Sequence, residues 1–284
     1  MILVAHSGPD SANALDWAAR EAVRQGDSLT IMHVIAVSGI TGDFPELPEE
    51  ITEAADELLA AAAERARELG VTEVETAKGY RSITAALVEM SREAELVVVG
   101  NRGHGEASSA VLGSVAYAVT SHASCPVVVV RGDGHTDIAP GHRVVVGIDG
   151  SRSGVHAGFF AAEFAQRAGA ELEVVGVWDT ATLGTVSSEF AARVGIVGLK
   201  DKHETQMHKW VDLAVAKLAE RFPGLKVTGS VEQGSPVVVL REKSADAGLL
   251  VVGTRGRGGF AGLLLGSVSH RLIHDIGCPI AVVR

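Results

Sequence analysis

Glycines at two fixed spacings make residues 253–269 the strongest candidate in this chain for binding chemistry. Gly253-Thr254-Arg255-Gly256 follows a short apolar run, and Gly266-Ser267-Val268-Ser269 begins after nine intervening residues. The apolar run predicts a buried strand, and the apolar residues at helical spacing after Ser267 predict a helix. A glycine-rich loop between a strand and a helix N-terminus can hold a phosphate through backbone N–H groups, because glycine places no Cβ between backbone and ligand. The alternative is a turn that needs glycine for its own geometry.

The same pattern occurs a second time, 153 residues earlier in the chain. Gly100-Asn101-Arg102-Gly103 is followed, after nine residues, by Gly113-Ser114-Val115-Ala116. A repeat of this length indicates duplication of a whole domain rather than a solenoid. We therefore predict a first domain over 1–131, a glycine-rich linker over 132–142 and a second domain over 143–284. The second domain holds about ten extra residues within 179–210.

Strands and helices alternate in both halves, which positions each glycine loop at the end of a strand. This alternation predicts an α/β fold of two tandem, doubly wound, five-stranded parallel-sheet domains of Rossmann-like type. In such sheets a ligand binds outside the carboxyl ends of the strands. We expect strands in the first half at 2–6, 29–37, 71–77, 96–100 and 127–131, with helices from Ser11 and over 49–69, 82–93 and 114–122. In the second half we expect a strand at 172–178 and, after a long excursion, a helix around 210–221.

Composition excludes several functional classes. The 284 residues are 46% hydrophobic but only 4% aromatic, so aliphatic side chains must fill the core. A net charge of −10 without a run of Lys or Arg argues against nucleic-acid binding. No apolar stretch is long enough for a membrane helix, and the first residues already read as a strand, so we expect a cytoplasmic location. Cys125 and Cys278 read as core residues, and the eleven histidines show no metal-ligand spacing.

The pattern Gly-x2-Gly-x9-Gly-Ser, after a Val-rich strand and before Cys-Pro and a final Val-rich strand, resembles the universal stress protein family. The opening of the second half, from Val144 to Ser151, is similar to that family's first strand and turn. The resemblance covers both halves. It implies an adenine-nucleotide-binding fold of the alpha-hydrolase-like type and a role in signalling or stress adaptation. It also implies ATP as the ligand, with Mg²⁺ where a metal bridges the phosphates, and a regulatory protein partner that the sequence does not identify.

In the second half the resemblance assigns a ribose-binding aspartate to Asp149 and backbone contacts with adenine to Val177. A carboxylate can accept hydrogen bonds from ribose hydroxyls, although an aspartate at this place can instead cap a helix. The implied phosphate contacts are Gly253, Arg255, Gly256, Gly266, Ser267, Val268 and Ser269.

The first half departs from this pattern at two positions. His6 stands where Asp149 stands, and Ala116 stands where Ser269 stands. Histidine cannot offer the paired acceptors of a carboxylate, and alanine lacks the hydroxyl. We therefore expect the second site to bind more tightly than the first. The remaining first-half candidates are Val34, Gly100, Arg102, Gly103, Gly113, Ser114 and Val115.

No nucleophile–base arrangement is visible in the sequence, so we expect at most slow ATP hydrolysis assisted by a metal. Two alternatives remain open. One is an enzyme of a related fold, because the sequence from Ser7 to Ser11 superficially resembles the loop of ATP pyrophosphatases. A separate string, Gly256-x-Gly258-x-x-Ala261, matches a dinucleotide-binding fingerprint, but the further strand with an acidic end that this fingerprint requires does not follow it. The other is a scaffold that binds no nucleotide.

Each half also ends in an apolar strand, at 127–130 and 280–283, with no helix after it. An exposed apolar edge invites association, so we predict that the two halves pair as an intramolecular, pseudo-twofold dimer. The full chain can pair again as a homodimer.

Overall fold

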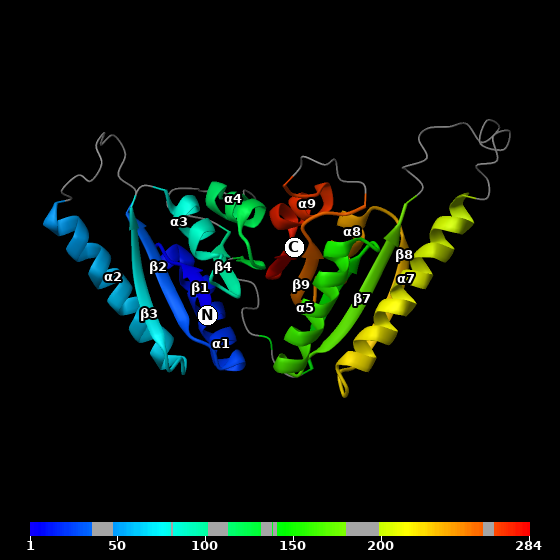
Figure 1. Ribbon diagram of the computed structural model, residues 1–284, viewed down its shortest axis with the longest axis horizontal. Coiled ribbons are helices and arrows are strands. Elements are labelled where there is room, and N and C mark those ends of the chain that lie inside the picture. The colour runs from blue at the N-terminus through cyan, green and yellow to red at the C-terminus, as the bar shows by residue number, and fades with distance from the viewer. Residues whose placement is uncertain are drawn as a thin grey trace. The chain divides into compact units, whose positions relative to one another are not determined.

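The chain folds into two compact units, Met1–Asp137 and Ile138–Arg284, in the computed structural model (Figure 1). Each unit contains one set of five parallel strands, with helices in the connections between them. The predicted α/β fold with parallel sheets is thereby confirmed. The structure describes residues 1–35, 48–80, 82–101, 113–131, 138, 141–179, 199–257 and 264–284.

The first unit has the strand order β3-β2-β1-β4-β5. Strands β1, β4 and β5 are short apolar runs that are buried on both faces, as is typical of parallel sheets. The strands are β1 Ile2–Ala5, β2 Leu29–Ile35, β3 Val74–Tyr80, β4 Leu96–Gly100 and β5 Val127–Val130. The helices are α1 Ala12–Gln25, α2 Glu49–Glu68, α3 Ile83–Met90 and α4 Ser114–His122, and a 3-10 turn, η1, spans Pro9–Ser11.

The second unit repeats this topology, with the order β8-β7-β6-β9-β10. Helix α7 packs on one face of its sheet and α8 on the other: Gly176 of β7 faces Met207 and Val211, whereas Gly147 of β6 faces Leu240. The strands are β6 Arg143–Ile148, β7 Glu171–Trp178, β8 Val227–Gln233, β9 Ala247–Gly253 and β10 Ile280–Val283. The helices are α5 Arg152–Ala168, α7 Leu199–Arg221, α8 Pro236–Lys243 and α9 Ser267–Asp275.

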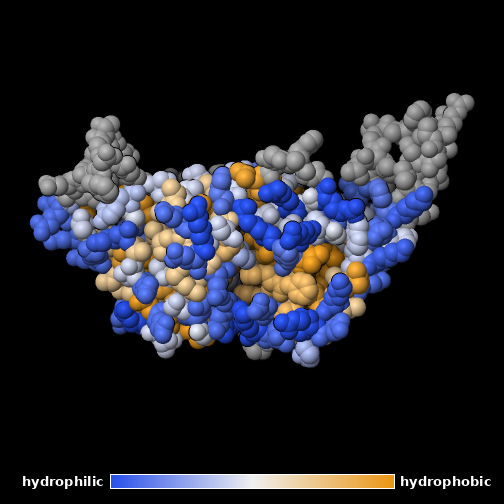
Figure 2. Space-filling view, viewed as in Figure 1, coloured by the Kyte–Doolittle hydropathy of each residue, from blue (hydrophilic) through white to orange (hydrophobic). Residues whose placement is uncertain are grey.

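Local sequence signals account for the ends of the helix that leads away from the candidate site. Ser151 caps the N-terminus of α5 by accepting a hydrogen bond from Gly154 N at 3.1 Å. Gly169 ends the same helix with φ 64°, the left-handed conformation that glycine adopts without strain. Val155 and Phe159 of α5 are exposed apolar side chains. Figure 2 shows an apolar area on the surface over this helix. Polar side chains dominate the neighbouring surface of α7 in the same view.

The cores are aliphatic, as the composition predicts, and each holds one cysteine. Cys125 and Cys278 are both buried immediately before the last strand of their unit. Burial raises the pKa of the Cys278 thiol to about 11. No helix in the described ranges is long and apolar enough to cross a membrane.

Several predicted boundaries differ from the observed ones. The third strand begins at Val74 rather than at Val71, because 71–73 belong to the turn after α2. Helix α7 begins at Leu199, well before the expected start near Trp210. The polar residues of this added stretch lack the apolar spacing from which a helix is predicted. The end of the second strand beyond residue 35 and most of the predicted linker lie outside the described residues.

Candidate functional site

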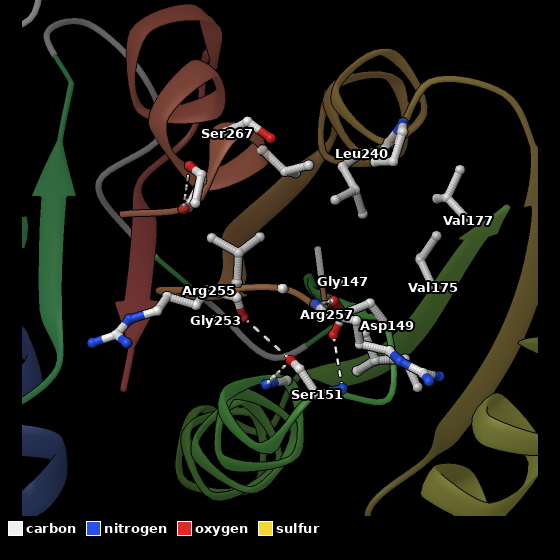
Figure 3. Close-up of a pocket in the computed structure, with 18 residues that line it drawn as sticks. Gly147, Asp149, Ser151, Val175, Val177, Leu240, Gly253, Arg255, Arg257 and Ser267 are labelled. Atoms are coloured by element: carbon white, nitrogen blue, oxygen red, sulfur yellow. Dashed lines mark hydrogen bonds between the residues drawn. The ribbon is translucent and has the colours of Figure 1, made fainter. Parts of the chain in front are cut away.

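A cavity of about 510 Å³ lies in the second unit, at the carboxyl ends of β6, β7 and β9 (Figure 3). The N-termini of α8 and α9 complete its wall. This is the edge of the sheet at which the fold class places ligands. All nine second-half residues proposed from the sequence line this one cavity. The lining residues are Gly147, Ile148, Asp149, Ser151, Gly154, Val175, Val177, Pro236, Leu240, Val252, Gly253, Arg255, Gly256, Arg257, Gly266, Ser267, Val268 and Ser269.

The carboxylate of Asp149 is fixed by two backbone N–H groups. Its Oδ1 accepts a hydrogen bond from Ser151 N at 2.9 Å, and its Oδ2 accepts one from Arg257 N at 2.9 Å. The first bond is local, whereas the second joins the β6 turn to the loop after β9. A carboxylate has about four acceptor positions, so further donors from a ligand can still be bound.

The loop glycines are required by the protein's own packing. A Cβ built on Gly256 would stand 2.6 Å from Asp149 Oδ2. One built on Gly253 would stand 2.9 Å from the backbone carbon of Ser153. At Gly266 it would approach the carbonyl oxygen of Thr254 to 3.3 Å. Glycine is therefore needed here even before a ligand is considered, and the turn-geometry interpretation of the motif holds alongside any binding role.

Helix α9 points its N-terminus at the cavity. The N–H groups of Ser267, Val268 and Ser269 form its first turn, where an α-helix offers no internal acceptor. Gly266 precedes them and donates its own N–H to Thr254 O at 2.7 Å, which closes the loop behind the helix. The positive end of the helix dipole and these three donors together favour an anion.

Two side chains expected at the anion lie differently from the prediction. The Ser269 hydroxyl is buried and donates to the carbonyl oxygens of Thr254 and Gly266, at 3.2 and 3.0 Å. It therefore stabilises the loop rather than offering its proton to a ligand. The Arg255 side chain points away from the cavity, so this residue lines the cavity with its backbone (Figure 3). Its carbonyl oxygen accepts hydrogen bonds from the hydroxyls of Ser151 and Ser153.

An apolar wall faces the Asp149 side of the cavity, and most of it was not predicted from the sequence. Val175 and Val177 of β7 and Leu240 of α8 point into the space (Figure 3). Gly147 leaves room for Leu240, because a Cβ there would stand 2.8 Å from Leu240 Cδ1. A glycine within the Val-rich run of β6 is the signal that could have indicated this close approach.

The strand registers correct the predicted correspondence between His6 and Asp149. Ile2 pairs with Leu29 and Leu96 as Val144 pairs with Leu172 and Leu249, so Ser7 stands at the place of Asp149 and His6 at that of Ile148. The positive-φ glycines that follow, Gly8 and Gly150, then also correspond.

His6 is only 7% exposed, and its Nδ1 lies 3.0 Å from Ser11 Oγ. That oxygen donates to Gly8 O at 2.8 Å and accepts from Ser7 N at 2.8 Å, so His6 Nδ1 carries the proton of the remaining bond. Burial and, secondarily, the neighbouring His33 lower the pKa of His6 to about 4. His6 is therefore neutral and engaged in a network of its own.

Larger side chains stand at other corresponding positions of the first unit. Ala5 and Met32 take the places of Gly147 and Val175, and both are buried. Val34, at the place of Val177, packs with Met32 over Gly79. Among the described residues these side chains occupy the strand ends that border the cavity in the second unit.

The scaffold of the first-unit loop is retained where the structure describes it. Gly113 donates its N–H to Asn101 O at 2.7 Å, as Gly266 does to Thr254. Gly100 ends β4, Ser114 and Val115 begin α4, and Ala116 is buried. Arg102 and Gly103 lie outside the described residues. Within the described part of the chain, no three His, Cys, Asp or Glu side chains are grouped as metal ligands.

The fold and the cavity define a class of tandem, doubly wound α/β modules with a ligand cavity at the carboxyl edge of a parallel sheet. The model of the universal stress protein family matches residues 1–131 and 141–284. The chain belongs to the universal stress protein family.

Relatives of known family support this assignment over the whole chain. A universal stress protein of Mycolicibacterium smegmatis is 34% identical, across 98% of this chain and 94% of its own length. A universal stress protein of Mycobacterium tuberculosis is 33% identical, across 97% and 93%. The crystal structure of a universal stress protein from Archaeoglobus fulgidus aligns with a TM-score of 0.70 at 20% identity, across 100% of this chain and 95% of that one, and shows the shared fold.

Proposed function

We propose that the second module binds an adenine nucleotide, with ATP as the principal ligand, and that the protein acts as a nucleotide-dependent regulator. The observation that carries this proposal is the arrangement across one cavity of a fixed carboxylate, an apolar wall and a helix N-terminus. These three environments match the three parts of a nucleotide. The cavity volume of about 510 Å³ falls within the range of about 300–1,000 Å³ that is usual for small-molecule sites.

The polarity of the cavity suggests an orientation for the ligand. The base would lie against Val175, Val177 and Leu240, where an apolar ring is removed from water. The ribose would place its hydroxyls at Asp149, whose carboxylate is already held by two N–H groups. The phosphates would then reach the first turn of α9.

The chemistry of the serine side chains supports binding more than catalysis. Ser151 and Ser153 donate to the Arg255 carbonyl oxygen, and Ser269 donates to Thr254 and Gly266. A carbonyl oxygen is not a general base, so these hydroxyls are not activated as nucleophiles. If Mg²⁺ accompanies ATP, it would be held by the phosphates, and hydrolysis would be slow.

Titration of the purified full chain with ATP, ADP and GTP in a calorimeter tests the proposal. We expect binding of both adenine nucleotides and a weaker response to GTP. Val177→Trp should fill the cavity and abolish binding, whereas Val238→Trp, on the exposed face of α8, should leave it unchanged. The absence of binding to every nucleotide would favour the scaffold alternative. Substrate-dependent release of pyrophosphate would favour the enzyme alternative.

A further inference from the structure

Trp210 of α7 contacts both loops that hold the Asp149 carboxylate. A Cβ built on Gly150 would stand 2.6 Å from Trp210 Cδ2 and 2.7 Å from its Cε2, so the indole lies directly against the Gly150 backbone. The guanidinium carbon of Arg257 lies 4.3 Å from the centre of the same ring. A cation at this distance from an indole is attracted by the negative face of the ring.

These two contacts meet at one carboxylate. Gly150 follows Asp149 directly in the β6 turn and has φ 75°, a conformation that side-chain-bearing residues rarely adopt. Arg257 supplies the N–H that Asp149 Oδ2 accepts at 2.9 Å. The indole thus contacts the turn that carries the carboxylate and the residue that fixes it. A substitution at Trp210 therefore removes a contact with Gly150, which follows Asp149, and a contact with Arg257, which donates to its carboxylate.

Helix α7 does not need Trp210 to stay on the sheet. Met207, Val211 and Leu218 are 7%, 2% and 2% exposed and form the buried stripe of the helix. Met207 and Val211 pack against Gly176 of β7. Trp210 lies beside this stripe and is only half-buried. Its position is therefore better explained by its contacts with the two loops than by anchoring of the helix.

The first module offers an internal comparison. Its helix α2 repeats the buried stripe as Ala55, Leu59 and Ala66, and Leu58 precedes Leu59 as Trp210 precedes Val211. Leu58 contacts the turn glycine Gly8, but it has no ring to hold a cation. The module with the tryptophan is thus the one that keeps the carboxylate.

We propose that Trp210 is a positioning residue that, through Gly150 and Arg257, sets the Asp149 carboxylate to bind the two hydroxyls of a ribose. This inference rests on the proposed nucleotide binding, and it adds a determinant outside the cavity lining. Loss of the indole should reduce the contribution of the ribose hydroxyls and leave the contributions of base and phosphates intact.

The test compares ATP with 2′,3′-dideoxy-ATP, using the full-length chain and calorimetry. The wild type should prefer ATP by about tenfold or more, because hydrogen bonds to a charged group are lost in the dideoxy compound. Trp210→Ala should lower the affinity for ATP towards that for the dideoxy compound, whose affinity should not change. Trp210→Phe keeps an aromatic ring and should retain most of the preference. Arg257→Ala removes the cation but keeps the N–H, and it should reproduce part of the loss if Trp210→Ala does not fold.

Results that contradict the role of Trp210 can be distinguished from results that contradict nucleotide binding itself. Equal losses for both nucleotides in Trp210→Ala would show general damage and overturn the inference. So would an unchanged preference for ATP in that variant and in Arg257→Ala, or a wild type that binds both nucleotides equally. A wild type that binds neither nucleotide would instead refute the proposed function itself.

Discussion

Substitution of Gly256 by alanine should weaken nucleotide binding through Asp149 rather than through the phosphates. The new Cβ would stand 2.6 Å from Asp149 Oδ2, whereas ordinary contacts begin at 3.4 Å. The oxygen must therefore move by about 0.8 Å. That movement disrupts the 2.9 Å bond from Arg257 N and displaces the carboxylate from the proposed ribose position.

The size of the effect follows from the bonds at stake. A hydrogen bond to a charged group contributes about 1.5–3 kcal/mol, so loss of the ribose contact should lower ATP affinity by about 10- to 100-fold. Calorimetric titration of Gly256→Ala measures this loss. Gly277→Ala is a matched control, because a Cβ built there meets nothing within 4 Å.

The decisive measurement repeats the substitution in an Asp149→Ala background. Without the carboxylate the new methyl group has no oxygen to displace, so Gly256→Ala should then have little further effect. If it weakens binding by the same factor in both backgrounds, the methyl group obstructs the phosphates directly, and the reasoning through Asp149 is refuted.

Four further predictions concern the two modules. Asp149→Ala should remove most high-affinity ATP binding while His6→Ala changes it little; equal losses in calorimetry would overturn this ranking. Because the pKa of His6 is about 4 in the folded state and about 6.5 when unfolded, the unfolded chain takes up the proton first, and stability should fall by roughly 2–3 kcal/mol between pH 7 and pH 4.5. Denaturant unfolding should show no such loss from this site in His6→Ala. Glu173 is 7% exposed and contacts Arg143 and Lys243, so Glu173→Ala should cost about 3 kcal/mol in denaturant unfolding. Glu171→Ala, at a half-buried residue of the same strand that pairs with Lys226, should cost less than about 1 kcal/mol. Pairing of the two halves through their last strands stays a prediction, and separately expressed halves that are both stable, soluble monomers would contradict it.

The features that the sequence predicted well are those encoded in contiguous residues. The Val-rich runs at β4 and β9 identify buried strands, and the glycine loops mark the sheet edge where the cavity lies. The aspartate after β6 could be placed from the motif that it shares with Gly150 and Ser151, but its predicted counterpart His6 was wrong by one residue, because the strand registers put Ser7 there. These inferences need only the period of the chain and the topology of a parallel sheet.

What the sequence could not predict depends on contacts between distant elements. Leu240 and Trp210 reach the site from α8 and α7, and no local pattern distinguishes them from ordinary helix residues. The orientation of a hydroxyl likewise cannot be predicted from the sequence. The motif places Ser269 near the ligand, but its hydroxyl donates to the carbonyl oxygens of Thr254 and Gly266. Compact packing of the loop decides this orientation.

Each module has one cysteine buried beside its last strand, so thiol labelling can report the local opening of each module separately. Cys278 has a pKa of about 11, so about one thiol in ten thousand is ionised at pH 7, and a thiol reagent should reach it only when the strand opens. Cys125 is buried in the equivalent place in the first module. The labelling rate at each cysteine therefore measures the opening of one module within the intact chain. A nucleotide bound in one module should slow labelling there first, so the occupied module can be identified without separating the two.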